Sequence, residues 1–185
     1  MSAVSGREYE FSLILSGVHE LTREVEDALF EAGCDDSTLS LQYGCIYMEF
    51  SRPAESLKAA ILSAIRDVRK SGIGADVVRV DECNLVTPAE IARRIGRSRQ
   101  LVNQYMTGKR GPGGFPAPEC NLAHGAPLWT WCAVSFWLAQ NDMIRPEELE
   151  EAEVVEAINC ALDIAHQRER NPELVDEISQ AVALP

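Results

Sequence analysis

Apolar and polar positions in the first 80 residues follow two different periods. Over 21–32 and 55–69, apolar side chains recur every three to four residues, which predicts two amphipathic helices. Four shorter segments are instead rich in strand-forming residues: 9–16, 38–42, 45–50 and 75–80. The predicted order is therefore β-α-β-β-α-β, the ferredoxin-like pattern. We expect an α+β fold in which residues 1–83 form a ferredoxin-like domain for dimerisation or sensing.

The segment LVTPAEIARRIG (85–96) predicts a short helix with strong boundary signals. Thr87 is placed as the N-cap, Pro88 is allowed as the first helical residue, and Glu90 completes a capping box. Gly96 ends the helix, because a left-handed residue is needed there. The apolar face of this helix consists of Ile91, Ala92 and Ile95.

A second helix is predicted directly after this turn, from an N-cap at Ser98 to Thr107. The spacing of Ala92 and Val102 about Gly96 lets the two helices cross closely. Two short helices joined by a tight glycine turn form a helix-turn-helix, in which the second helix enters the major groove of DNA. Arginine can bind guanine there, and asparagine or glutamine can bind adenine. The polar side of the predicted recognition helix carries Arg99, Gln100, Asn103, Gln104 and Thr107.

The segment KRGPGGFPAP (109–118) contains too much glycine and proline for a helix, so a loop is predicted. Two short strands are expected around His124-Gly125, followed by an apolar helix over 131–140. A hairpin attached to a helix-turn-helix is a wing, and we place this wing at 109–130. The aromatic residues Phe115, Trp129, Trp131 and Trp137 are expected to form its packing core.

The charge of the chain is unevenly distributed. The formal net charge is -12, yet residues 84–141 carry six Lys/Arg and only two Asp/Glu, for a balance of +4. Residues 1–83 carry -7 and residues 142–185 carry -9. A basic region inside an acidic chain favours an anionic partner, and the acidic flanks would confine contact with DNA to this one face. The six cations are Arg93, Arg94, Arg97, Arg99, Lys109 and Arg110.

Taken in order, SRQLVNQYMTGKRGPGGFPAP and then LWTWCAVSFWL resemble the winged helix-turn-helix DNA-binding domains of the MerR and AlpA/excisionase-like superfamily. The resemblance covers less than a third of the chain. It implies that the polar side of the recognition helix reads bases. The loop is longer and richer in glycine than the usual excisionase turn, and its amides either follow the phosphates or the loop is flexible. The residues implied to contact the DNA backbone are Arg97, Ser98, Lys109, Arg110 and His124.

The last third of the chain predicts two helices. Pro146 starts a long helix with an acidic beginning and a sustained apolar stripe, and a shorter helix follows over 173–182. We assign 144–185 as a helical C-terminal arm after the winged domain at 84–143. This arm either serves dimerisation or packs on the N-terminal domain. Its carboxylates are interpreted as a solvated helix face.

Neither catalysis nor a cofactor is indicated. The sequence contains no G-x-S-x-G, Walker, Rossmann or H-E-x-x-H motif. The six cysteines form no C-x-x-C pair and lie at no ligand spacing from the three histidines, so we expect reduced thiols and no metal. A zinc site or a disulfide framework is the alternative. Without a long apolar run or a signal sequence, a cytoplasmic protein without a membrane partner is expected.

The N-terminal β-α-β-β-α-β order also occurs in RNA-recognition domains, and YGCIYMEF (43–50) is a faint match to their third-strand motif. Cys45 replaces one of the stacking aromatics, and only Tyr47 remains to stack on a base. The charge of -7 over residues 1–83 also repels a phosphate backbone. RNA binding by this domain is therefore disfavoured.

The sequence thus predicts a sequence-specific regulator of transcription, a repressor or autoregulator, that binds double-stranded DNA as a homodimer. Residues 98–107 would enter the major groove, and the wing would contact the backbone or the minor groove. One alternative is an excisionase-like architectural factor that bends DNA. Another is an antitoxin-type regulator whose N-terminal domain binds a protein or a small-molecule effector.

Overall fold

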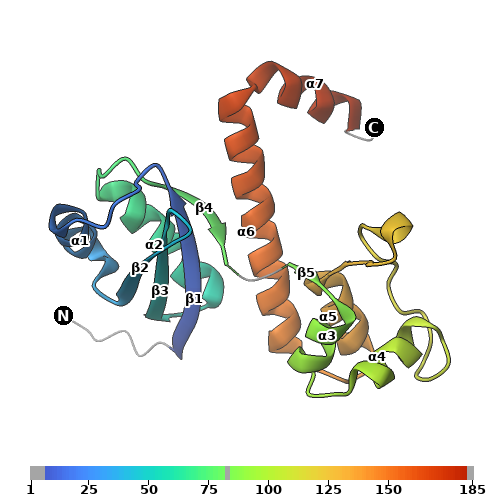
Figure 1. Ribbon diagram of the computed structural model, residues 1–185. Coiled ribbons are helices and arrows are strands. Elements are labelled where there is room, and N and C mark those ends of the chain that lie inside the picture. Colours follow the sequence, from blue (N-terminus) through green and yellow to red (C-terminus); the bar gives the residue numbers. More distant parts are fainter. Residues whose placement is uncertain (1–6, 82–83, 183–185) are drawn as a thin grey trace. The chain divides into compact units, whose positions relative to one another are not determined.

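The computed structural model describes residues 7–81 and 84–182, and it has a mixed α+β fold (Figure 1). Its contacts divide these residues into two compact units, one made of residues up to 81 together with those from 157 onward, the other of 84–156. Helix α6 (Pro146–Arg170) contributes to both units. The C-terminal arm predicted at 144–185 is therefore divided, because its residues up to 156 belong to the second unit and those from 157 onward to the first.

The first unit contains a four-stranded antiparallel sheet in the order β2-β3-β1-β4. Helix α1 continues into a π-helical turn at Phe30–Cys34. Helix α7 (Pro172–Val182) also belongs to this unit. The remaining elements are β1 (Arg7–Ser16), α1 (Arg23–Leu29), β2 (Ser37–Gln42), β3 (Cys45–Ala54), α2 (Leu57–Lys70) and β4 (Asp76–Val80).

Local signals explain the boundaries of these elements. The hydroxyl groups of Thr22 and Ser56 accept hydrogen bonds from the amides of Val25 in α1 and Ala59 in α2, as N-caps do. Tyr43 and Gly44 join β2 to β3 with positive φ angles of 50° and 79°, as a tight type I′ hairpin requires. Alternate residues of β1 and β3 face the core. The largest fully buried side chains on these two strands are Leu13, Leu15, Ile46 and Met48.

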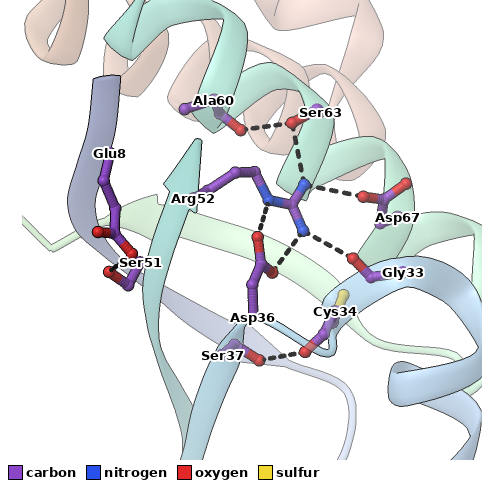
Figure 2. A network of polar contacts seen from close by, with 10 residues as sticks. All are labelled: Glu8, Gly33, Cys34, Asp36, Ser37, Ser51, Arg52, Ala60, Ser63 and Asp67. Atoms are coloured by element: carbon purple, nitrogen blue, oxygen red, sulfur yellow. Dashed lines mark hydrogen bonds and ion pairs between the residues drawn. The ribbon is translucent and has the colours of Figure 1, made fainter. Parts of the chain in front are cut away.

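One charged side chain, Arg52 on β3, lies in this core and is only 7% exposed (Figure 2). Its guanidinium binds both oxygens of Asp36, at 2.6 and 2.8 Å. It also donates to Asp67 at 2.8 Å, Ser63 at 2.9 Å and the carbonyl of Gly33 at 2.7 Å. All five N–H donors of the guanidinium therefore have an acceptor, and the network ties β3 to α2 and to the π-helical turn.

The second unit has its own core. Strand β5 pairs antiparallel with β6, with Val86 opposite Trp129. The core contains Val86, Ile91, Ala92, Val102, Trp129, Val134, Trp137 and Leu138. Besides the first part of α6, the elements are β5 (Leu85–Val86), α3 (Pro88–Arg94), α4 (Arg99–Met106), a 3₁₀ turn (Leu122–His124), β6 (Trp129–Thr130) and α5 (Trp131–Gln140).

The pair of strands predicted around His124-Gly125 is present only in part. That position holds the 3₁₀ turn, and one isolated bridge joins Cys120 to Leu128. Asn121 and Gly125 flank the turn with φ angles of 62° and 69°, so the chain cannot stay extended there. The following segment forms β6 instead, which pairs with the start of the unit rather than within a hairpin.

Candidate nucleic-acid interface

Helices α3 and α4 are short and are joined by a tight turn, as predicted. Thr87 and Ser98 cap them by accepting the amides of Glu90 and Leu101, both at 3.2 Å. Gly96 occupies the turn with φ +62°. The small Ala92 and the hydrophobic Val102 are both buried in the shared core, as the spacing of the predicted crossing requires.

Two of the six cations predicted to favour an anionic partner already bind a carboxylate within α3. The carboxylate of Glu90 accepts from Arg93 at 2.6 Å and from Arg94 at 3.0 Å. The guanidinium of Arg94 also lies over the ring of Trp131, 4.8 Å from its centre. Hydrogen bonds from the two arginines lower the pKa of Glu90 from 4.5 to about 2. We therefore assign this trio to the stability of the unit.

The other four cations stand at the two ends of α4 and are exposed to solvent. Within the described residues, none of them makes an ion pair. The outer side of α4 adds exposed polar side chains at Gln100 and Asn103, whereas Gln104 is half-buried. The helix thus presents donors and acceptors between positive charges. The four cations are Arg97, Arg99, Lys109 and Arg110.

Ser98 and Thr107, both predicted contacts, have local roles in the structure. Ser98 is the N-cap of α4, and the hydroxyl of Thr107 donates to the carbonyl of Asn103 at 2.8 Å. These hydroxyls hold the ends of the helix. His124 ends the 3₁₀ turn, and its side chain lies outside the described part of the structure.

The glycine-rich loop after α4 is held against aromatic side chains. The indole N–H of Trp137 donates to the carbonyl of Gly113 at 2.8 Å, and that of Trp129 donates to the carbonyl of Pro116 at 3.0 Å. Phe115 packs edge-on against both rings, with centres 5.0 Å from Trp137 and 6.2 Å from Trp129. The loop is therefore anchored to the core of the unit.

Gly111 explains part of the glycine content of this loop. A Cβ atom there would approach the ring of Tyr105 to 2.7 Å, which is too close for a side chain. The amides of Lys109 and Arg110 both donate to the carbonyl of Gln104, at 2.9 and 3.2 Å, and so close the end of α4. The positions of the two cations thus follow directly from the end of the helix.

A pocket of about 410 Å³ lies between this loop, α5 and the first part of α6. Its lining includes Phe136, Trp137, Cys132, Glu153 and Glu156. Burial, together with a hydrogen bond to Glu156, raises the pKa of Cys132 from 9.0 to about 12. The thiol is therefore protonated at neutral pH and is a poor nucleophile.

Comparison with protein-family models, curated proteins and solved structures finds no match to this chain. No described helix is long and apolar enough to span a membrane. Among the described residues, no cluster of three or more histidine, cysteine or acidic side chains could hold a metal. The five described cysteines are free thiols: Cys34, Cys45, Cys120, Cys132 and Cys160.

Proposed function

We propose that this protein is a sequence-specific regulator of transcription that binds double-stranded DNA as a homodimer, through helix α4 in the major groove. The observation that carries the proposal is the arrangement around α4. Exposed cations stand at both ends of a short capped helix whose outer side is polar. In a chain with a net charge of -12, such a surface favours a polyanion that also offers hydrogen-bonding base edges.

The side chains divide into two roles in this proposal. Arg99, Gln100 and Asn103 project from the exposed side of α4 and would read bases. Arg97, Lys109 and Arg110 lie on the turns that flank the helix and would neutralise phosphates. Ser98 and Thr107 contribute indirectly, because their hydroxyls hold the ends of the recognition helix.

We also infer that residues 84–143 form a winged helix-turn-helix of the MerR or AlpA/excisionase-like kind, with the anchored loop at 109–118 in place of a hairpin wing. The anchoring by Trp129 and Trp137 supports this, because it fixes the loop that follows Lys109 and Arg110 against the core of the unit. For the first unit, the antiparallel order β2-β3-β1-β4 supports a ferredoxin-like domain. Such a domain suits dimerisation or the sensing of an effector.

The decisive experiment is selection from randomised double-stranded DNA by the purified full-length protein. We expect enrichment of one motif, repeated as two half-sites about one helical turn apart. The affinity for this motif should fall steeply as the salt concentration rises. A folded protein that enriches no motif and binds no DNA at low salt would refute the proposal.

A further inference from the structure

The two edges of the four-stranded sheet are treated differently. The outer edge of β4 is covered by α6 within the same unit. The side-chain amide of Asn159 accepts from the N–H of Val80 at 2.9 Å and donates to its carbonyl at 3.1 Å, as a neighbouring strand would. His166 adds a contact with Asp76 at 2.9 Å. The outward backbone groups of Val80 on this edge are therefore satisfied.

Within the part of the chain that the structure describes, the opposite edge, β2, carries no such cover. Gln42 faces Cys45 across the two-residue turn and so forms the hydrogen-bonded pair that closes the hairpin. The backbone N–H and C=O groups of every second residue before Gln42 also point towards β3. The amide of Ser51 accordingly donates to the backbone carbonyl of Asp36 at 3.1 Å. The intervening Ser37, Leu39 and Leu41 therefore direct their N–H and C=O groups outward. Among the described residues, no further strand or side chain pairs with these groups.

The sequence of β2, STLSLQ, contains none of the devices that normally prevent edge pairing. It has no charged residue and no proline, and its register with β3 continues without a bulge. Leu41 is 47% exposed at this edge, on the face of the sheet that elsewhere covers the core. A further strand would cover this leucine.

We propose that β2 pairs antiparallel with β2 of a second copy of this chain, about a two-fold axis at Leu39. In this register all outward-facing residues find partners, since Leu39 meets Leu39 of the second copy and Ser37 meets Leu41. On the other face Thr38 meets Ser40, a favourable polar pair. One continuous sheet then spans both copies.

Charge favours a second copy over a foreign peptide. Two chains of -12 repel each other, and a contact without charge adds nothing to this repulsion. Residues 37–48 form an uncharged stretch, whereas acidic residues lie on either side of it. The inference deepens the proposed function, because it names the contact for the dimer on which that function rests. It is tested without DNA, so that its failure and the failure of DNA binding are distinguishable.

The test is sedimentation equilibrium of the full-length protein, wild type and Leu41→Glu. We expect the wild type to dimerise. Leu41→Glu should raise the dimer dissociation constant at least tenfold, because each copy then places a new carboxylate at the contact between the two β2 strands. Leu62→Glu is the matched control, since Leu62 is similarly exposed at 43% but lies on α2. This control should dimerise like the wild type. Circular dichroism establishes that both variants are folded.

Amide hydrogen exchange locates the contact independently of any variant. The amides of Leu39 and Leu41 should exchange quickly at low protein concentration and slowly at high concentration. Ser40, whose amide bonds to β3, should be protected at both. A wild type that stays monomeric at 100 µM overturns the proposal. So does a dimer that is unaffected by Leu41→Glu, or one that is disrupted instead by Ile178→Glu on the exposed apolar side of α7.

Discussion

The indole N–H of Trp137 donates a hydrogen bond to the carbonyl of Gly113 at 2.8 Å, and this bond joins helix α5 to the loop that follows the proposed recognition helix. Trp137 also packs against Tyr105 of α4, with ring centres 5.4 Å apart. The side chain of Trp137 thus contacts both α4 and the loop that follows Lys109 and Arg110. The geometry of the candidate interface therefore depends on the core beneath it.

Trp137→Phe should loosen the loop without emptying the core. The phenyl ring keeps part of the packing of the indole, but the carbonyl of Gly113 loses its donor, and this lost hydrogen bond should cost about 1–2 kcal/mol of unfolding free energy. DNA affinity should also fall, because the loop that follows Lys109 and Arg110 is held less firmly. Urea denaturation and DNA titration measure the two effects. Trp131→Phe is the control, and an equal loss of stability in that variant would contradict the role assigned to the hydrogen bond.

Arg99→Ala and Lys109→Ala should differ in kind. Loss of Arg99 should remove about 1–3 kcal/mol of discrimination at one base position, because arginine binds guanine through two donors. Loss of Lys109 should weaken binding to all sequences and lower the slope of log affinity against log salt by about one. Competition titrations with single-base variants of the selected motif separate the two outcomes. Arg66→Ala, an exposed cation on α2, should change neither.

The sequence was informative where structure is decided locally. The caps at Thr87 and Ser98 and the left-handed Gly96 are confirmed, because each depends on neighbours within a few residues. The hairpin predicted around His124-Gly125 is reduced to one isolated bridge, because β6 finds its partner in β5, far back along the chain. No pattern within a short stretch of sequence predicts that β5 pairs with β6. The anchoring of the loop by Trp129 and Trp137 is equally non-local.

Arg52 was missed because the predicted strand ends at residue 50, whereas β3 continues to Ala54. It nevertheless shares the alternation of Ile46, Met48 and Phe50, all buried, and this parity is the signal that places it inside. Its acceptors lie on two other elements, at Asp36 and Asp67, and no spacing in the sequence indicates that they converge. Burial of a charge was therefore predictable, but its partners were not.

Glu90→Gln should destabilise the protein in a way that depends on pH. The folded-state pKa of about 2 lies below the ordinary 4.5, so the stabilisation is complete above about pH 4.5 and is lost as the pH falls towards 2. At pH 7 the variant should lose about 1 kcal/mol, a modest value because the ion pairs are partly solvated. Urea denaturation at pH 7 and pH 3 should show the difference shrinking. Glu119→Gln serves as the control, and a pH-independent loss in Glu90→Gln would refute the ion-pair explanation.

Arg52→Met should be the most destabilising of these substitutions. It removes five donors and leaves the carboxylates of Asp36 and Asp67 without their cation, which should cost about 3–5 kcal/mol of unfolding free energy. Adding Asp36→Asn and Asp67→Asn should recover part of the loss, because the remaining groups are then uncharged. Arg69→Met removes a more exposed pair with Asp76, at 3.5 Å, and should cost less than about 1 kcal/mol. Equal losses in urea denaturation for Arg52→Met and Arg69→Met would show that the network contributes no more than a surface pair.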